Sequence, residues 1–373
     1  MNCNGFNQIS IKTINGSIKF NLQRFIDKNN ENSTDYFNLT GQFDESYNTE
    51  RFDDLLLKYA PEVSYKLVEE IAEDVTGERQ ISDQGIQNIV IKKALKLSTK
   101  IKNEYLPNLT KDMPKINESV DIYDKESKEV ILEMDGVLTK EQKAKRDKVK
   151  KGKKSFVGTD IVILQNKKGF YDYIMSPIDK NGDDSLKLSD CIKSKIIDEY
   201  KDSKEALNIV VISDGASDIR TTLMSVFLFQ IIIILDWYHL TKRIREFMSM
   251  IAINKAEKVL HMNFIKMNLW NGETDKVIAY LTKIDTKNVE RKREFITYLE
   301  KHKSEIINYD KRKKAKKTIG SGLIEKTVDQ IVAVRQKKKG MSWTKLGSKS
   351  LAILKMNKLK QKKEDFYEKY EAA

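Results

Sequence analysis

The pattern of apolar and polar positions begins with a strict alternation near the start of the chain. Residues 6–26 alternate between the two kinds on both sides of Asn15-Gly16. An Asn-Gly pair between two alternating segments favours a β-hairpin, because both residues accept the positive φ angles of a tight turn. Residues 27–50 are polar and lack a period, so we expect a loop or linker there.

The next segment, residues 51–97, has the period of helices. Gly77 ends the first apolar repeat, and Ser82 is placed to cap a second helix. The first repeat consists of Val63, Leu67, Val68, Ile71, Ala72 and Val75, and the second of Ile86, Ile89 and Val90. Two helices joined by a short glycine-containing turn predict a helix-turn-helix-like unit.

The second of these helices would present Gln84, Gln87 and Asn88. Amide side chains of this kind can read base edges in a DNA groove. A plain pair of antiparallel helices fits the same pattern. The local acidity also disfavours phosphate contacts, since four carboxylates lie nearby, on Glu69, Glu70, Glu73 and Asp74.

From residue 128 the pattern changes to strands, after a connector over residues 98–124 that we expect to be helical at first. A first strand runs from Glu129 into Asp135-Gly136, and Phe156–Gln165 pairs with Phe170–Met175 around the Lys168-Gly169 turn. A helix is predicted over 188–203, a strand over Ile209–Ser213, a helix over 216–227 and a strand over Gln230–Leu235. Strands alternating with helices predict an α/β fold.

After His239 the chain is helical in pattern for about 70 residues, with no sign of a strand. Residues 322–338 are predicted to form one helix, and the segment from 344 onward another. Two Lys-rich runs flank the predicted strands and helices, at Lys140–Lys154 and Lys311–Lys317. Ordinary solvated loops would have the same composition.

Charged residues are unevenly distributed along the chain. The chain of 373 residues has a net charge of +13, from 68 Lys and Arg against 55 Asp and Glu. Residues 1–100 hold 12 and 15 of these, so residues 101–373 hold 56 and 40, an excess of 16 positive charges. A basic excess of this size suits a polyanionic partner such as nucleic acid, although a Lys-rich proteome would also produce it.

Cysteines and apolar runs exclude several classes of protein. The only cysteines, Cys3 and Cys191, lie far apart and outside any CxxC or Cys/His cluster, which argues against a disulfide framework or a structural zinc site. No apolar run approaches the roughly 20 residues of a membrane span. The first residues lack the pattern of a signal peptide. We therefore expect a cytoplasmic, nucleoid-associated protein with no membrane partner.

Three carboxylates are placed where a divalent-metal site needs them. Asp135 and Asp214 each follow a predicted strand, and Glu325 lies in the first turns of a predicted helix. Strand ends and a helix start can meet at one edge of a sheet, and Mg²⁺ or Mn²⁺ prefers such oxygen ligands. Each residue also has a structural explanation, because Asp-Gly is good turn chemistry, Asp caps helices, and Glu is favoured near helix starts.

Four short motifs around these residues together indicate a protein family. The strings ILEMDG, VVISDGASDI, ILDWYHL and IGSGLIEKTVDQIVAVRQKKKGMSW together resemble bacterial insertion-sequence transposases of the DDE class, most similar to the ISKra and ISLre types. The resemblance runs from about Asp135 to the C-terminal end of the chain, and it is weaker in the segments KTINGSIKFNLQRF and SYKLVEEIAEDVTG.

The resemblance implies a fold and a site. It implies a ribonuclease-H-like mixed sheet flanked by helices, in which Asp135, Asp214 and Glu325 match the three acids that bind two Mg²⁺ or Mn²⁺ ions. Asp236 and His239 match a D-x-x-H signature with a supporting role. The long stretch between Asp214 and Glu325 resembles a helical insertion.

Basic residues beside Glu325 have a physical use in such an enzyme. Lys337, Lys338 and Lys339 would meet the phosphates of a DNA strand, together with Arg335 on the same helix and Lys313 upstream. Trp343 could stack on an unpaired base, and core packing is an equally good explanation for one Trp.

The predicted organisation follows from these segments. Residues 1–50 form a hairpin and linker, 51–124 a helical DNA-recognition region, 125–240 with 318–343 the catalytic core, 241–317 the helical insertion, and 344–373 a C-terminal helix. The expected activity is metal-dependent cleavage at element ends and 3′-hydroxyl strand transfer into double-stranded target DNA, by a homodimer or larger assembly. A nuclease of the same fold, a non-catalytic DNA-binding protein and a merely basic RNA-binding protein remain as alternatives.

Overall fold

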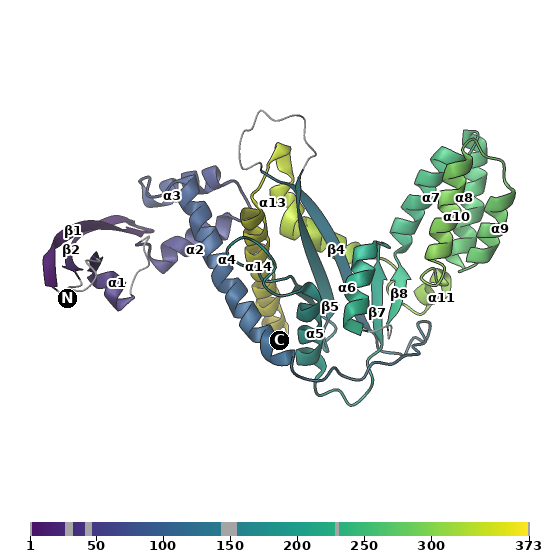
Figure 1. Ribbon diagram of the computed structural model, residues 1–373, viewed down its shortest axis with the longest axis horizontal. Helices are drawn as coiled ribbons and strands as arrows, with labels where there is room; N and C mark the ends of the chain where they lie inside the picture. The colour runs from purple at the N-terminus through teal and green to yellow at the C-terminus, as the bar shows by residue number, and fades with distance from the viewer. Residues whose placement is uncertain (1, 27–32, 42–46, 143–154, 228–230, 372–373) are drawn as a thin grey trace.

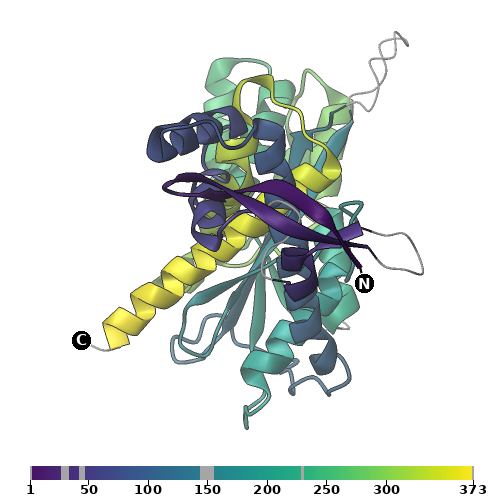
Figure 2. The same ribbon diagram turned by 90° about the vertical axis from the view of Figure 1, so that its left-hand side faces the viewer.

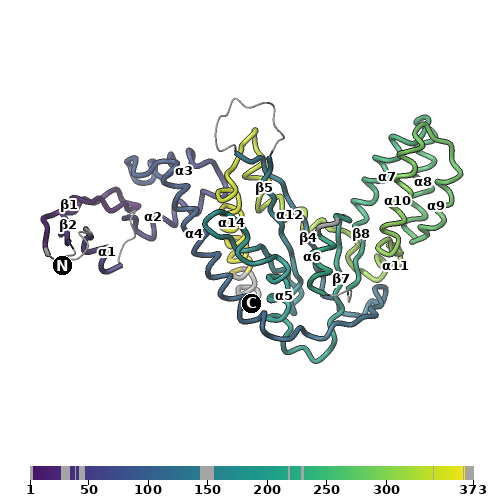
Figure 3. The backbone as a smooth tube through the Cα atoms, viewed as in Figure 1, coloured from purple at the N-terminus to yellow at the C-terminus, as the bar shows by residue number. Residues whose placement is uncertain are grey.

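The fold is described from a computed structural model of the chain (Figure 1). The structure describes residues 2–26, 33–41, 47–142, 155–227 and 231–371. In Figure 3 the N-terminal hairpin and a helical bundle lie at opposite ends of the molecule, with a β-sheet between them.

The N-terminal hairpin is confirmed. Strand β1 (Asn2–Thr13) pairs antiparallel with β2 (Gly16–Ile26), and Thr13 lies opposite Gly16, whose φ of 104° needs glycine. Figure 2 shows this twisted hairpin from the N-terminal side of the molecule. The polar segment after it is not only a loop, because it contains a third strand, β3 (Ser33–Asp35), and a short helix, α1 (Tyr36–Thr40).

Three helices follow, one more than the two that the periodicity predicts: α2 (Glu50–Tyr59), α3 (Tyr65–Thr76) and α4 (Asp83–Tyr105). Gly77 ends α3 with a φ of 75°, and the Ser82 hydroxyl caps α4 by accepting the Gly85 N–H at 3.2 Å. Helix α4 is long and packs along the C-terminal helix α14 (Lys345–Glu371), so the helical region shares a hydrophobic core with the sheet (Figure 1).

The central sheet has five strands in the order β6-β5-β4-β7-β8. Strand β5 runs antiparallel to both of its neighbours, and β4, β7 and β8 are parallel to one another. The strands are β4 (Val130–Lys140), β5 (Phe156–Gln165), β6 (Tyr171–Ile174), β7 (Ile209–Ser213) and β8 (Ile232–Leu235). The predicted α/β class with a mixed sheet is confirmed.

Alternation along β4 and β7 divides the sheet into two faces. Leu132, Met134 and Val211 pack against α5 (Leu188–Tyr200) and α6 (Ser217–Phe227) in one core cluster. Ile131, Val137, Val210 and Ile212 face the other way and join the clusters built with the insertion helices and α12 (Gly322–Val328). Successive strand residues point to opposite faces, so Glu133, Asp135 and Asp214 belong to the α12 face.

The predicted helical insertion consists of helices joined by loops. Helix α7 (Trp237–Ile251) leaves the end of β8 and leads into a helical bundle (Figure 1). Its apolar residues, which include Leu269, Leu281 and Phe295, belong to one core cluster with Val210 and Ile212 of the sheet. The remaining helices are α8 (Lys255–Trp270), α9 (Thr274–Lys283), α10 (Val289–Lys301) and α11 (Tyr309–Lys314).

The predicted helix over residues 322–338 is interrupted. Helix α12 continues into a π-helical turn, η2 (Asp329–Ala333), and then α13 (Val334–Gln336), while Lys338–Gly340 forms a 3-10 turn, η3. Another short 3-10 turn, η1 (Leu106–Asn108), follows α4. Among the described helices, none is both long enough and apolar enough to cross a membrane.

Candidate active site

Asp135 lies within a strand and not at its end, which corrects the sequence prediction. Strand β4 continues through Gly136 to Lys140 and stays paired with β5, from Asp135 opposite Ile161 to Lys140 opposite Phe156. A hairpin turn at Asp135-Gly136 is therefore excluded. On its other side, β4 pairs with β7 only as far as Glu133 opposite Ile212. Asp135 therefore lies just beyond the last residue pair between the parallel strands β4 and β7.

Asp214 lies beside Asp135. It stands two residues after Ile212, just as Asp135 stands two residues after Glu133, and parallel strands advance together. Asp214 directly follows β7, and its Oδ1 accepts the Ala216 N–H at 2.8 Å across a turn in which Gly215 has a φ of 86°. Asp214 and Gly215 thus form the turn that an Asp-Gly pair favours, and this turn holds the Asp214 carboxylate at the end of β7.

Glu325 is brought to the same face by α12, and its side chain is 40% exposed. The carboxylates of Asp214 and Glu325 act on Asp135. Burial raises the pKa of Asp135, the Gly136 N–H lowers it, Asp214 and Glu325 raise it, and His239 lowers it. Asp214 and Glu325 therefore lie near enough to Asp135 to influence its charge.

Asp236 is fully buried and accepts four hydrogen bonds. Its Oδ1 accepts the backbone N–H groups of Tyr238 and of His239, the latter at 3.2 Å, and so caps α7. Its Oδ2 accepts the N–H of Ser321 at 2.7 Å and the Ser321 hydroxyl. Burial raises the pKa of Asp236, but His239, Ser321 and the Tyr238 N–H lower it to about 2. With both oxygens engaged, Asp236 holds two chain segments in place.

His239 lies between Asp236 and Glu325. Its Nδ1 is 3.5 Å from Asp236 Oδ2 and 3.5 Å from Glu325 Oε1. Asp236 raises the pKa of His239, burial lowers it, and Glu325 and Asp214 raise it further. One potential ligand atom from each of Asp236, His239 and Glu325 lies within 4.8 Å of the others, a spacing that could hold a cation.

Sequence reasoning missed a fourth acid on this face, Glu133. Only 1% of this residue is exposed; its Oε2 accepts the Ile324 N–H at 3.1 Å, and its Oε1 has no hydrogen-bond partner. Burial raises the pKa of Glu133 to about 7 despite the Ile324 N–H, and Asp236 and Glu325 contribute to the rise. The signal was available, because a residue two positions before Asp135 on a strand shares its face.

A second group that sequence reasoning missed, centred on His302 and Glu305 of the insertion, packs against the turn that follows Asp214. His302 Nδ1 lies 2.6 Å from Glu305 Oε2, and Arg220 of α6 pairs with Glu305 Oε1 at 3.0 Å. A Cβ on Gly215 would lie 3.1 Å from His302 Cε1, so the imidazole packs directly against this turn. No local pattern reveals this contact, because His302 is far from Gly215 in the sequence.

Of the residues predicted to read DNA bases, Gln84 and Asn88 are exposed on α4, and Gln84 Nε2 donates to Asn88 Oδ1 at 3.2 Å. Gln87 is half-buried, and a Cβ on Gly347 would lie 3.5 Å from its Nε2. Gln87 therefore faces α14, and only Gln84 and Asn88 keep the accessibility that base reading needs.

Arg335 and Trp343 require a correction, because both are buried. The Arg335 guanidinium lies 4.9 Å from the Trp343 ring centroid and 5.6 Å from that of Tyr65. Trp343 Nε1 donates to the Gln336 carbonyl at 3.0 Å, and its backbone N–H donates to Lys140 at 2.9 Å. These contacts join α13 to the helical region. Because both side chains are buried, neither is accessible for the predicted DNA contacts.

The predicted lysines differ in position. Lys337 and Lys338 are exposed, while the side chain of Lys339 and residues 143–154 of the first Lys-rich run lie outside the part that the structure describes. Lys313 is also exposed, with its Nζ 5.7 Å from the Trp270 ring centroid. Two other cations of the 311–317 run are structural, since Arg312 and Lys317 both pair with the buried Glu129, at 2.7 Å each.

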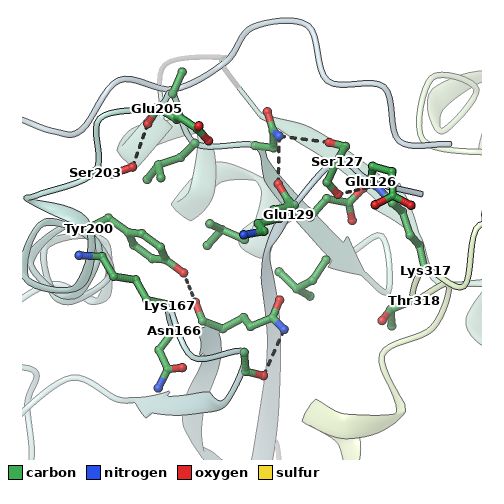
Figure 4. Close-up of a pocket in the computed structure, with 18 of the residues that line it drawn as sticks. Glu126, Ser127, Glu129, Asn166, Lys167, Tyr200, Ser203, Glu205, Lys317 and Thr318 are labelled. Atoms are coloured by element: carbon green, nitrogen blue, oxygen red, sulfur yellow. Dashed lines mark hydrogen bonds and ion pairs between the residues drawn. The ribbon is translucent and has the colours of Figure 1, made fainter. Parts of the chain in front are cut away.

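An open cavity of about 1010 Å³ lies at the other end of the parallel strands (Figure 4). It is lined by the start of β4 around Glu129, the end of β5 around Asn166, and the loop that contains Glu205. Asp135 lies in the middle of β4, and Asp214 follows the end of β7. The cavity lies at the starts of these strands, so it is separate from the acid cluster of Asp135, Asp214 and Glu325.

Comparison with protein-family models and with curated proteins gives no match for the chain. The functional argument therefore depends on the acid cluster and its surroundings.

Proposed function

We propose that the central sheet is a ribonuclease-H-like core and that the protein is a DDE transposase. The proposal rests on the position of Asp135 on β4 beside Asp214, which directly follows the neighbouring parallel strand β7. Glu325 lies on α12, which is hydrogen-bonded to β4. The order of three strands, a helix, and a strand that ends in a carboxylate supports the same fold.

The donor set fits divalent cations. Asp135, Asp214 and Glu325 supply carboxylate oxygens, which Mg²⁺ and Mn²⁺ prefer. Burial raises the pKa of Asp135 most, and Asp214 and Glu325 raise it further, so burial and neighbouring negative charge both oppose its ionisation; bound cations would relieve the repulsion. When bound, a pair of such ions activates the attacking oxygen and stabilises the leaving oxygen of a phosphoryl transfer.

The protein's own groups have separate tasks in this mechanism. Asp135, Asp214 and Glu325 would hold the ions against the scissile phosphate. Asp236 fixes the starts of α7 and α12 through its four hydrogen bonds, and His239 lies beside Glu325. Water then attacks the phosphorus at the element end and releases a 3′-hydroxyl. That hydroxyl would attack a phosphorus of the target DNA and form a new phosphodiester bond, while the bond from that phosphorus to the target's own 3′-oxygen breaks and the 3′-oxygen leaves as a hydroxyl. The two DNAs would thus be joined without a covalent enzyme intermediate.

Charge supports a DNA substrate. The excess of 16 positive charges lies in residues 101–373, which include the acid cluster, and Lys313, Lys337 and Lys338 remain exposed there. Gln84 and Asn88 are the residues we propose for base contacts. Joining requires two ends in one complex, so the proposal includes a dimer or a larger assembly on DNA.

The test uses a labelled duplex containing the DNA that borders the coding sequence, a second plasmid as target, and Mg²⁺ or Mn²⁺. The wild-type protein should cut at a defined position and join the new 3′ end to the plasmid. Asp135→Asn, Asp214→Asn and Glu325→Gln should each lose both products by at least about 100-fold while still binding the duplex.

The products distinguish the alternatives. Cleavage without joining would identify a nuclease, and metal-independent DNA binding without cleavage would identify a non-catalytic binding protein. Undiminished cleavage by all three variants would refute the assignment of the acids.

A further inference from the structure

We propose that Glu133 is a positioning residue that fixes Glu325 relative to Asp135 by capping α12 from the neighbouring strand. The inference rests on the proposed function, because it gives Glu133 a task in assembling the three acids. It concerns a residue that lies within the string ILEMDG but to which the resemblance assigns no role.

Helix α12 has no cap of its own. Ser321 occupies the N-cap position, but its side chain makes no capping hydrogen bond and instead donates to Asp236. An N-cap side chain normally accepts the N–H of the second or third helical residue. Here Ile324 is the third residue, and Glu133 Oε2 accepts its N–H at 3.1 Å. A strand residue therefore performs the capping that Ser321 does not.

The position of this hydrogen bond links two catalytic acids. Glu133 precedes Asp135 by two residues on β4 and shares its face, and Ile324 directly precedes Glu325 on α12. One hydrogen bond thus joins the backbone next to Glu325 to the strand that bears Asp135. Asp236 Oδ2 holds the Ser321 N–H at 2.7 Å, so the start of α12 is fixed at two points.

The surroundings of Glu133 indicate that its acceptor oxygen is required and its charge is not. The residue is 1% exposed, and Oε1 has no hydrogen-bond partner. No cation pairs with Glu133 among the described ion pairs, in contrast to the buried Glu129, which pairs with Arg312 and Lys317. A neutral amide oxygen can accept the same N–H, so Glu133→Gln should preserve the contact.

The experiment compares Glu133→Gln with Glu133→Ala in the full-length protein, with Glu129→Gln as the control for loss of a buried acid next to the same strand. Three quantities are measured: hydrogen exchange at the Ile324 amide, Mn²⁺ affinity by calorimetry, and kcat and KM for DNA cleavage. Glu133→Leu, which keeps the volume without an acceptor, replaces Glu133→Ala if the latter does not fold.

We expect Glu133→Gln to stay within about 3-fold of wild type in kcat, and Glu133→Ala to lose about 100-fold in kcat, because a small displacement of a catalytic group has an effect of that size. The KM for DNA should be unchanged in both, and only Glu133→Ala should exchange the Ile324 amide faster. The Glu129→Gln control should leave this amide protected.

Two results would overturn the proposal. Loss of Mn²⁺ affinity and cleavage in Glu133→Gln would make Glu133 a charged ligand, and wild-type amide exchange in Glu133→Ala would remove the capping role. If the wild-type protein does not cleave DNA at all, the proposed function fails, while the Ile324 exchange still decides whether Glu133 caps α12.

Discussion

Asp236 accepts the backbone N–H of Ser321 at 2.7 Å, across a separation of 85 residues in the chain. The other oxygen of the same carboxylate caps α7, the helix that carries His239. One buried side chain thereby connects the helix bearing His239 to the helix bearing Glu325. The supporting role proposed for Asp236 follows from this connection.

Replacing this connection gives the first prediction. Asp236→Asn should lower the free energy of unfolding at pH 7 by roughly 3 kcal/mol. The NH₂ group of Asn would face N–H and O–H donors whose hydrogen bonds a carboxylate oxygen accepts in the wild type. Urea unfolding measures this loss. A change below about 0.5 kcal/mol would contradict the connecting role.

The same variant has a defined pH dependence. The pKa of Asp236 is lowered from 3.8 to about 2 in the folded protein, so its contribution to stability is complete above pH 3.8 and is lost as the pH falls through 2. The advantage of wild type over Asp236→Asn should therefore shrink by about 2 kcal/mol between pH 5 and pH 2. A constant difference across this range would refute the lowered pKa.

Gly215 carries the second prediction. Its φ of 86° is strained for other residues, and a Cβ would lie 3.0 Å from Leu235 Cδ1 and 3.1 Å from His302 Cε1. Gly215→Ala should lower stability by about 1–3 kcal/mol and weaken divalent-cation binding, because it displaces the turn that holds Asp214. Thermal unfolding with and without Mn²⁺ measures both effects. Gly340→Ala is a matched control, since Gly340 has a φ of 70° with nothing within 4 Å of its Cβ position.

Glu129 gives a prediction about stability alone. It receives two hydrogen bonds from the fully buried Arg312, at 2.9 and 2.7 Å, and one from Lys317 at 2.7 Å. Glu129→Ala should destabilise the protein by about 3–5 kcal/mol, because it leaves a buried guanidinium without its carboxylate. Mn²⁺ affinity of the folded fraction should not change, since Glu129 directly precedes β4 and Asp135 lies in the middle of that strand. An unchanged unfolding midpoint in urea would contradict this description.

The exposed Lys337 and Lys338 should behave differently from the buried Arg335 that precedes them. Lys337→Ala with Lys338→Ala should reduce the slope of log affinity for DNA against log salt by up to about 2, with little change in stability. Arg335→Lys should instead destabilise the fold, because the smaller ammonium group loses its contacts with Trp343 and Tyr65. Fluorescence anisotropy over a range of salt concentrations, together with urea unfolding, separates the two effects. If Arg335→Lys reduced the salt dependence of DNA binding and the double lysine variant did not, Arg335 would contact the phosphates and the two lysines would not.

Much of the fold could be predicted because the decisive signals are local. The strand Ile209–Ser213 and the strand Phe156–Gln165 were predicted with the bounds that the structure has, since apolar runs between turn residues define both. Gly77 and Ser82 mark the helix ends by backbone conformation and capping, which depend on a few neighbouring residues.

The errors come from contacts between distant segments. Asp135-Gly136 has the composition of a turn, but β5 is long enough to keep β4 paired for five more residues. Arg335 belongs to a cationic run, but Tyr65 and Trp343 bury its guanidinium. The spacing of Glu133 from Asp135 predicts that the two share a face, but the partner of Glu133, Ile324, lies 191 residues away, so no local pattern reveals their hydrogen bond.

The central claim is that Asp135, Asp214 and Glu325 share divalent cations, and Mn²⁺ calorimetry on the wild-type protein and three single variants tests it most directly. In the presence of DNA, wild type should bind Mn²⁺ with a stoichiometry near two. Asp135→Asn, Asp214→Asn and Glu325→Gln should each weaken or abolish that binding, while Glu129→Gln should not. Equal Mn²⁺ binding by wild type and all three variants, or no binding by any, would contradict the account.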